Sequence, residues 1–375
     1  MNSFIAQAVE GVPQTAVEDN PSPQLGDPAG SNLFPVAVID GGVSYNDPAL
    51  APYILRRPGD HRLILGIDFN EDDSLPFDGP AVPPFETLTE RSSQQSWLEW
   101  ISENKEALAK NILNFLTIVL KPGSQGHGTH VSGIVLKSCY FECGIMPIKV
   151  FGKNPPTLDM IIDAIEFAKL SGVRVINMSL GYEAKVESYT GGKPVYQDQK
   201  AWDRLQKAIE SSPDILFVVA AGNSNIYFTK DEKCFFPACL DEPNVITVGA
   251  IDELSRLANF TNYDPQKVHI YAPGVNIKSN WINNEWKEVS GTSMAAPYIA
   301  GMASYIWNHS RRLTASQLKE VLIEASLFSE GMIFKKYSLS EQGKVVYTHT
   351  SNIRSVIPEA KKAIEENIFR SLKEL

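Results

Sequence analysis

Cysteine is scarce in this chain, and the few cysteines do not build a framework. Four cysteines in 375 residues are too few for the disulfide scaffold of a small secreted domain. They fall into two close pairs, Cys139/Cys143 and Cys234/Cys239. Neither spacing is the CxxC knuckle that is typical of zinc sites. Buried thiols or a local disulfide are therefore favoured over a metal site.

Long apolar runs and an excess of basic charge are also missing. Lys and Arg number 34 against 44 Asp and Glu, a net charge of -10, which argues against nucleic acid as the main partner. No apolar run approaches the roughly 20 residues of a bilayer span, so no membrane span is expected. The N-terminus lacks the basic and apolar regions of a secretory signal, which slightly favours the cytoplasm unless a leader has been removed.

Short apolar runs alternate with helical patterns along most of the chain. Strands are expected at "FPVAVIDGG" (34–42), "RLILGIDF" (62–69), "GIMPIKVF", "VRVINMSLG", "ILFVVAAGN" and "NVITVGAI". "HGTHVSGIVL" and "TLDMIIDAIEFAKLSG" are expected helices, the second with Thr157 as its N-cap and Gly172 as its C-cap. This alternation predicts an α/β fold in which a parallel sheet is covered by helices on both faces.

Three of the expected strands end at residues that suit a site. Asp40 ends the first strand, and Gly181 and Asn223 follow two later ones. Ligands of parallel sheets bind at the carboxyl ends of the strands. Hydrolysis by a nucleophile needs a serine, an imidazole that takes its proton, a carboxylate that orients the imidazole, and donors for the oxyanion. The strand ends therefore form a candidate site.

The serine and the imidazole have clear candidates. Ser293 stands in "GTSMAAP", whose small residues leave room for a substrate. His127 opens a predicted helix between two glycines, and His130 lies one turn further on nearly the same face. Only one of the two histidines can meet Ser293. The position at the helix start is the more open, so His127 is the predicted base.

Five blocks of the sequence resemble a known family. "VAVIDGG", "GHGTHVSGI", "INMSLG", "VVAAGN" and "GTSMAAP" are similar to the signature blocks of the subtilisin-like serine proteases, the subtilases, and stand in that family's order of Asp, His and Ser. The resemblance covers roughly residues 34–327. It implies a three-layer subtilisin-like fold and a serine endopeptidase that cleaves peptide or protein substrates through an acyl-enzyme. It implies no required cofactor.

The resemblance also implies a role for individual residues. Ser293 would be the nucleophile, His127 the general base and Asp40 the carboxylate that orients it. Asn223 would donate to the oxyanion together with the backbone N–H of Ser293. The implied substrate-binding residues are an edge for an extended peptide, formed by Ser179, Leu180 and Gly181, and a wall of the primary specificity pocket, formed by Ala220, Ala221 and Gly222.

The sequence departs from the family in three places. The segment between Asp40 and His127 is much longer than in compact members, which predicts an insertion at about 70–121, as either an added surface helix or a cap over the cleft. "CFFPAC" places Phe235 where relatives commonly carry a small residue at the pocket floor, which predicts a shallow pocket and small side chains at the cleaved position. Only 39 residues precede Asp40, too few for a folded inhibitory prodomain, so a mature form or an intracellular enzyme inhibited by its own arm is expected.

The resemblance divides the chain into three parts. We expect an irregular arm over residues 1–33, a catalytic domain over 34–327, and a hairpin and helix over 328–375 that pack on the same domain. Many subtilases use calcium for stability, and the candidate ligands here are Asp72/Asp73 and Glu18/Asp19. Neither pair has a recognisable ligand spacing, so a solvated loop is the favoured interpretation of both.

Two other functions remain open at this point. On the same scaffold, a transpeptidase or peptide macrocyclase would let an amine, instead of water, resolve the acyl-enzyme. A third possibility is a catalytically silent homologue that only binds peptides, because a fold alone does not establish activity.

Overall fold

The computed structural model describes residues 33–57, 60–78, 125–152, 155–190, 193–196, 198–228, 233–328, 338–339 and 345–346. Over these residues the chain divides into two compact units. The first unit comprises the described residues up to Gly133, together with Cys143–Val173 and Ser279–Trp286. The second comprises Ile134–Glu142, Arg174–Lys278 and the described residues from Lys287 onward.

Three parallel strands form the centre of the first unit. They are β1 (Phe34–Asp40), β5 (Cys143–Lys149) and β4 (Ile67–Asp68), in the order β1-β5-β4. β1 runs alongside β5 from Phe34 opposite Cys143 to Asp40 opposite Lys149. Every residue of β1 and β5 is buried, as expected for strands covered on both faces. The helix α6 (Leu158–Leu170) packs against β1.

The stretch 62–69, which was expected to be one strand, is divided in the structure. β3 (Asp60–Ile64) pairs antiparallel with β2 (Arg56–Arg57), whereas β4 pairs parallel with β5. The change of partner falls at Leu65 and Gly66, where the backbone runs so close to Pro147 that a Cβ on Gly66 would strike the Pro147 carbonyl. The prediction of a single strand was wrong because periodicity does not reveal a change of pairing partner.

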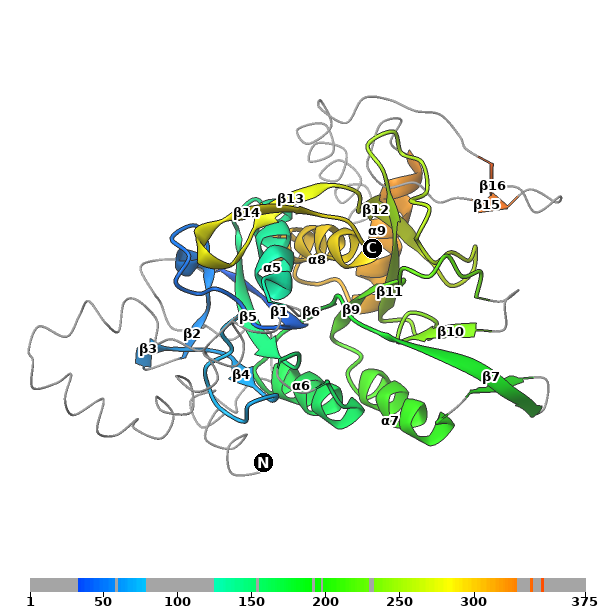
Figure 1. The fold of residues 1–375 in the computed structure, drawn as a ribbon, viewed down its shortest axis with the longest axis horizontal. Coiled ribbons are helices and arrows are strands. Elements are labelled where there is room, and N and C mark those ends of the chain that lie inside the picture. The colour runs from blue at the N-terminus through cyan, green and yellow to red at the C-terminus, as the bar shows by residue number, and fades with distance from the viewer. Residues whose placement is uncertain are drawn as a thin grey trace, which may run out of the picture. The chain divides into compact units, whose positions relative to one another are not determined.

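Four parallel strands form the sheet of the second unit. Their order is β12-β11-β9-β6, and α8 (Thr292–His309) packs against all four. Figure 1 shows α8 and α7 (Gln199–Glu210) on opposite sides of β9. The helix α9 (Ala315–Phe328) packs on α8 and β9. The four strands are β6 (Val175–Met178), β9 (Leu216–Ala220), β11 (Val245–Ile251) and β12 (Ile270–Pro273).

Two segments that were predicted to contribute to the site leave the same edge of this second sheet. β6 and β9 are parallel, with Met178 opposite Val219. The segments that follow them, Ser179–Gly181 and Ala221–Asn223, are therefore neighbours at the carboxyl ends of adjacent strands, where the sequence predicted a site.

A small antiparallel sheet follows Gly181 directly. Its order is β10 (Lys233–Phe236), β7 (Tyr182–Thr190) and β8 (Lys193–Tyr196). Phe236 lies opposite Tyr182 and stacks on Trp202, with ring centroids 4.4 Å apart. Cys234 forms a disulfide with Cys239, which agrees with the local-disulfide interpretation. None of the four cysteines is free.

Both predicted helices occur in the structure, and the N-cap predicted for α6 is confirmed. α5 spans His127–Ser138. At the start of α6 the Thr157 side chain accepts a hydrogen bond from the Met160 N–H at 3.2 Å. The C-cap of α6 is Ser171, one residue earlier than predicted, and Gly172 follows it with a φ of +72°. Glycine suits this left-handed position because it has no Cβ.

The remaining described elements are short. They are η1 (Ala51–Tyr53), β13 (Ile277–Asn280), η2 (Ile282–Asn284), β14 (Trp286–Val289), and the antiparallel pair β15 (Ser338–Leu339) and β16 (Val345–Val346). The arm at 1–32, the helical pattern at 92–120 and most of the C-terminal segment lie outside the described residues. Among the helices that the structure does describe, none has the length and hydropathy to cross a bilayer.

Candidate active site

The Asp40 carboxylate and the His127 imidazole are hydrogen-bonded in the first unit. His127 Nδ1 lies 2.8 Å from Asp40 Oδ1 and 3.0 Å from Asp40 Oδ2. The bond joins the last residue of β1 to the first residue of α5. The Asp40 side chain is 1% exposed and the His127 side chain 27%. With Nδ1–H bound to a buried carboxylate, Nε2 is the nitrogen left to act as a base.

The pKa of His127 is raised above its ordinary value. Burial acts to lower this pKa, but the negative charge of Asp40, the hydrogen bond to Asp40 and the charge of Asp78 together outweigh burial. Both carboxylates therefore stabilise the imidazolium. A histidine that takes a proton during a reaction benefits from this stabilisation, because the imidazolium forms as the proton arrives.

Gly128 allows the helix to approach the Asp40 strand end. A Cβ at position 128 would lie 3.2 Å from Asp40 Oδ1 and would collide with the carbonyl oxygen of Gly42. Any larger residue would push the start of α5 away from β1. The second glycine of "GHG" is thus needed for the hydrogen bond between Asp40 and His127.

Ser293 lies in the first turn of α8, in the second unit. Pro297 stands four residues later and has no N–H, so the Ser293 carbonyl has no helical donor. The hydroxyl of Ser179 donates to this carbonyl at 2.8 Å, and Ser293 Oγ donates to the Ser179 carbonyl at 3.3 Å. Ser179 was predicted only as part of a peptide-binding edge. It also holds the backbone of Ser293.

The side-chain amide of Asn223 has a determined orientation. Asn223 Oδ1 accepts the Thr292 N–H at 2.9 Å and the Thr292 hydroxyl at 3.0 Å. Because a backbone N–H can only donate, the amide atom that faces it must be the oxygen. The Nδ2 group then turns toward Gly291, where a Cβ would lie 3.4 Å from Asn223 Nδ2 and 3.7 Å from the Ser293 nitrogen. The Asn223 Nδ2 group and the Ser293 nitrogen thus lie near the same place at the start of α8.

Two of the residues expected to bind substrate, Gly181 of the peptide edge and Gly222 of the pocket wall, lie against the ring of Phe235. A Cβ on Gly222 would lie 2.9 Å from Phe235 Cγ, and one on Gly181 would lie 2.8 Å from Phe235 Cδ1. The ring therefore lies against both glycines. The side chains of Leu180, Ala220 and Ala221 are buried in the core. These three residues can therefore offer a substrate mainly their backbone groups.

Sequence reasoning missed two residues that hold this region together. Asn262 is fully buried. It donates from Nδ2 to the Ala221 carbonyl at 2.8 Å and accepts at Oδ1 from the Ser224 and Ile226 N–H groups at 2.9 and 3.0 Å. Thr292 binds Asn223 and accepts from the Gly222 N–H at 3.0 Å. No local pattern marked Asn262, because it stands in an irregular stretch eleven residues after the end of β11.

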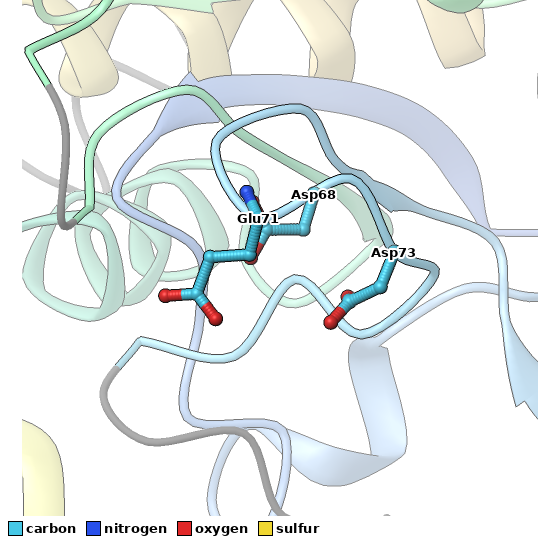
Figure 2. A group of neighbouring side chains, drawn as sticks. All are labelled: Asp68, Glu71 and Asp73. Carbon is cyan, nitrogen blue, oxygen red and sulfur yellow. The ribbon is translucent and has the colours of Figure 1, made fainter. Parts of the chain in front are cut away.

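The first unit contains a group of acidic side chains, drawn in Figure 2. The carboxylates of Asp68, Glu71 and Asp73 offer oxygens that lie within 4.8 Å of one another. The sequence had suggested Asp73 together with Asp72 as calcium ligands, but Asp72 is exposed and is not part of this group. Glu18 and Asp19 lie outside the described residues.

A calcium ion does not fit this acidic group, because a lysine already occupies it. Lys149 Nζ lies 2.7 Å from Asp68 Oδ2 and 3.5 Å from Glu71 Oε1. Asp68 Oδ1 accepts the Asn70 and Glu71 N–H groups at 2.8 and 2.9 Å. Calcium takes six to eight oxygen ligands, whereas both oxygens of Asp68 already have partners. The ammonium supplies the positive charge that a metal would bring.

An aspartate at a strand end that binds a histidine at a helix start, together with a serine at the start of another helix, is typical of serine hydrolases with an α/β fold. The sequence model of the subtilase family matches residues 32–352. The chain therefore belongs to the subtilase family, the family of the subtilisin-like serine proteases. This confirms the family that the five sequence blocks indicated.

Individual relatives agree with this assignment. The chain is 30% identical to a thermophilic serine proteinase of Bacillus sp. (strain AK1) over 292 residues, which covers 75% of this chain and 54% of that protein. It is 34% identical to subtilisin DY of Bacillus licheniformis over 206 residues, covering 52% of this chain and 69% of that protein. The chain thus spans about half to two thirds of the length of these relatives.

Solved structures confirm the fold. A cold-adapted subtilisin-like serine proteinase superposes with a TM-score of 0.54 at 24% identity, over 80% of this chain and 85% of that one. A lanthipeptide protease superposes with a TM-score of 0.57 at 17% identity, over 81% and 84%. At such identities the likeness shows the fold alone, and it is the three-layer subtilisin-like fold that the sequence predicted.

Proposed function

We propose that the chain is a serine endopeptidase in which Ser293 is the nucleophile, His127 the general base and Asp40 the carboxylate that orients the base. The observation that carries the proposal is the hydrogen bond between Asp40 and His127 at 2.8 Å. Membership of the subtilase family supports the pairing of this base with Ser293.

The proposed reaction has two stages. Ser293 Oγ attacks the scissile carbonyl carbon while its proton passes to His127 Nε2, and the oxyanion accepts hydrogen bonds from Asn223 Nδ2 and the Ser293 N–H. The C–N bond then breaks, and the leaving amine takes the proton from His127. Water attacks the remaining ester with His127 again as the base. The free carboxylic acid leaves, and Ser293 recovers its proton.

We also propose a way in which a peptide binds to the second unit. The segment Ser179–Gly181 leaves the carboxyl end of β6, and an extended peptide is proposed to pair with its backbone. Phe235 lies against Gly181 and Gly222, so it fills space between the two sides of the proposed primary pocket. We expect small side chains, such as alanine or serine, at the cleaved position.

A fluorophosphonate probe tests the nucleophile. The wild type is expected to be labelled on Ser293, and Ser293→Ala is expected to remain unlabelled. Ser290→Ala is a matched control, because Ser290 is an exposed serine three residues away that bonds to Asn276. Equal labelling of the wild type and Ser293→Ala would refute the proposal. A wild type that is never labelled would favour the catalytically silent homologue that only binds peptides.

Product masses distinguish hydrolysis from ligation. When a linear peptide library is cleaved in water enriched in oxygen-18, hydrolysis puts the heavy oxygen into the new carboxyl end. A transpeptidase or macrocyclase would instead give joined or cyclic products that have gained no water. The masses therefore decide between the proposed endopeptidase and the ligase alternative in one measurement.

A further inference from the structure

Asp78 is a buried carboxylate that the proposed reaction does not use. Its Oδ1 accepts the Gly126 N–H at 2.7 Å. Its Oδ2 accepts the Thr129 N–H at 2.8 Å and the Thr129 hydroxyl at 2.6 Å. All three donors lie at the start of α5, the helix that His127 begins.

The start of α5 needs a partner from elsewhere in the chain. The first N–H groups of a helix have no acceptor within the helix, and a Ser, Thr, Asp or Asn just before it usually supplies one. Here Gln125 and Gly126 precede His127. Asp78 provides the missing acceptors from about fifty positions earlier, and a negative charge at a helix N-terminus is also favourable.

Asp78 is tied by its backbone to the segment that follows Asp40. The Asp78 N–H donates to the Val43 carbonyl at 3.2 Å, and the Val43 N–H donates to the Pro76 carbonyl at 2.9 Å. The Ser44 N–H donates to Thr129 Oγ1 at 3.0 Å. Asp78 thus links the loop that follows Asp40 at the end of β1 to the helix that begins with His127.

Charge gives Asp78 a second influence on His127. Among the described residues, Asp40 at the end of β1 and Asp78 are the two charged groups that raise the pKa of His127. The pKa of Asp78 itself is raised to about 6, because burial and, to a smaller extent, the charge of Asp40 outweigh the lowering effect of its hydrogen bonds from Thr129 and Gly126. Asp78 is therefore mainly ionised at neutral and alkaline pH.

We propose that Asp78 is a positioning residue. By accepting hydrogen bonds from the start of α5, it holds the His127 imidazole against Asp40; we call this set of hydrogen bonds the brace. The inference rests on the proposed role of His127 as the general base. Nothing in the reaction requires Asp78 to touch the substrate. Its role is to hold the ring in place and to add a negative charge that raises the pKa of His127.

Asp78→Asn is the principal test. The amide has nearly the same volume, but its NH₂ group must face a donor at one of the two positions, so the brace is broken. We expect kcat/KM to fall by about tenfold to 100-fold, the loss that a misplacement of about 1 Å causes. We also expect the acidic limb of the kcat/KM profile to move to lower pH, because one of the charges that raise the pKa of His127 is gone.

The same variant is measured without relying on activity. In a Ser293→Ala background, the titration of His127 is followed by NMR of histidine labelled in the ring, with and without Asp78→Asn. A lowered pKa of His127 together with a shifted Nδ1–H resonance supports the inference even if the wild type proves unable to react with a fluorophosphonate. An unchanged His127 titration and a kcat/KM within twofold of the wild type overturn it, even if the wild type is labelled.

Two further changes separate positioning from general stability. Thr157→Ala removes an ordinary N-cap from α6, and we expect a lower melting temperature with an unchanged pH profile. If Asp78→Asn does not fold, Thr129→Val removes one donor to Asp78 while keeping the side-chain volume. It should lower kcat/KM, and Thr129→Ser should restore it. Equal activity of these two Thr129 variants would count against the brace.

Discussion

Ser179 and Ser293 exchange two hydrogen bonds, each hydroxyl donating to the backbone carbonyl of the other residue. The bond to Ser293 exists because Pro297 cannot supply the N–H that would otherwise occupy this carbonyl. Asn177 Nδ2 in turn donates to Ser179 Oγ at 3.0 Å. The segment proposed to bind substrate backbone is therefore coupled directly to the proposed nucleophile.

Ser179→Ala should disturb the nucleophile more than the binding of substrate. The variant leaves the carbonyl of the partly buried Ser293 without its donor, and an unsatisfied buried acceptor costs at most about 1–3 kcal/mol. We expect kcat to fall several-fold with a smaller change in KM, and the melting temperature to fall as well. Steady-state kinetics on a chromogenic peptide, beside thermal denaturation, checks this. A change in KM alone would show that Ser179 acts only as a binding edge.

Asn223→Ala should lower kcat by roughly 100- to 1,000-fold, the loss typical for one oxyanion donor in subtilisin-type enzymes. The variant also removes the acceptor of two hydrogen bonds from Thr292, so a structural effect must be separated from the loss of the donor. Thr292→Val removes one of these two hydrogen bonds, together with the bond from the Gly222 N–H, and keeps Asn223 Nδ2. A kcat for Thr292→Val as low as that for Asn223→Ala would mean that the amide acts through the helix start and not on the oxyanion.

Phe235→Ala should widen the substrate preference. Removal of the ring opens space between Gly181 and Gly222, and each methylene that a pocket gains or loses is worth about 1–3 kcal/mol. We expect kcat/KM for a peptide with leucine or phenylalanine at the cleaved position to rise at least tenfold relative to one with alanine. Leu257→Ala is the control, because Leu257 packs on the same core cluster as Phe235. Both variants should lose stability, but only Phe235→Ala should change the preference.

The pH profile of the wild type should reflect the raised pKa of His127. A general base must be neutral, so activity is lost as pH falls through its pKa. Because the charge and hydrogen bond of Asp40 outweigh burial, the acidic limb of kcat/KM is expected above the ordinary histidine value of about 6.5. Asp40→Asn should move this limb to lower pH and cut the plateau by about 10⁴-fold, since the imidazole then loses its required tautomer. A limb that does not move in Asp40→Asn would show that another group titrates.

Lys149→Met should create a dependence on calcium that the wild type lacks at the acidic group. Loss of one partner from a buried ion pair costs about 3–5 kcal/mol, and the carboxylates of Asp68 and Glu71 are then free to bind a cation. We expect a lower melting temperature for this variant, partly restored by millimolar calcium. Lys169→Met removes an exposed partner of Glu166 and should change little. Equal gains from calcium in the wild type and in Lys149→Met would contradict our interpretation of the site.

Much of the fold and most of the candidate residues could be predicted from local patterns. Buried parallel strands are continuous apolar runs, so β1, β6, β9 and β11 stood out, and small residues around Ser293 and His127 marked positions that must be approached closely. The split between β3 and β4 could not be predicted, because pairing partners are chosen by contacts between distant segments.

What the sequence alone determined about this protein is its family and most of its parallel strands, and it marked Asp40, His127, Ser293 and Asn223 as the residues of a proposed site. Each of these is written in a short run of neighbouring residues. Only the tertiary structure decided that Asp78 caps the helix of His127, that Lys149 takes the place of a metal among three carboxylates, and that Ser179 holds the Ser293 backbone. The reason is physical: a buried polar group must find a partner, and it takes the one that folding brings near, however far away in the chain that partner lies.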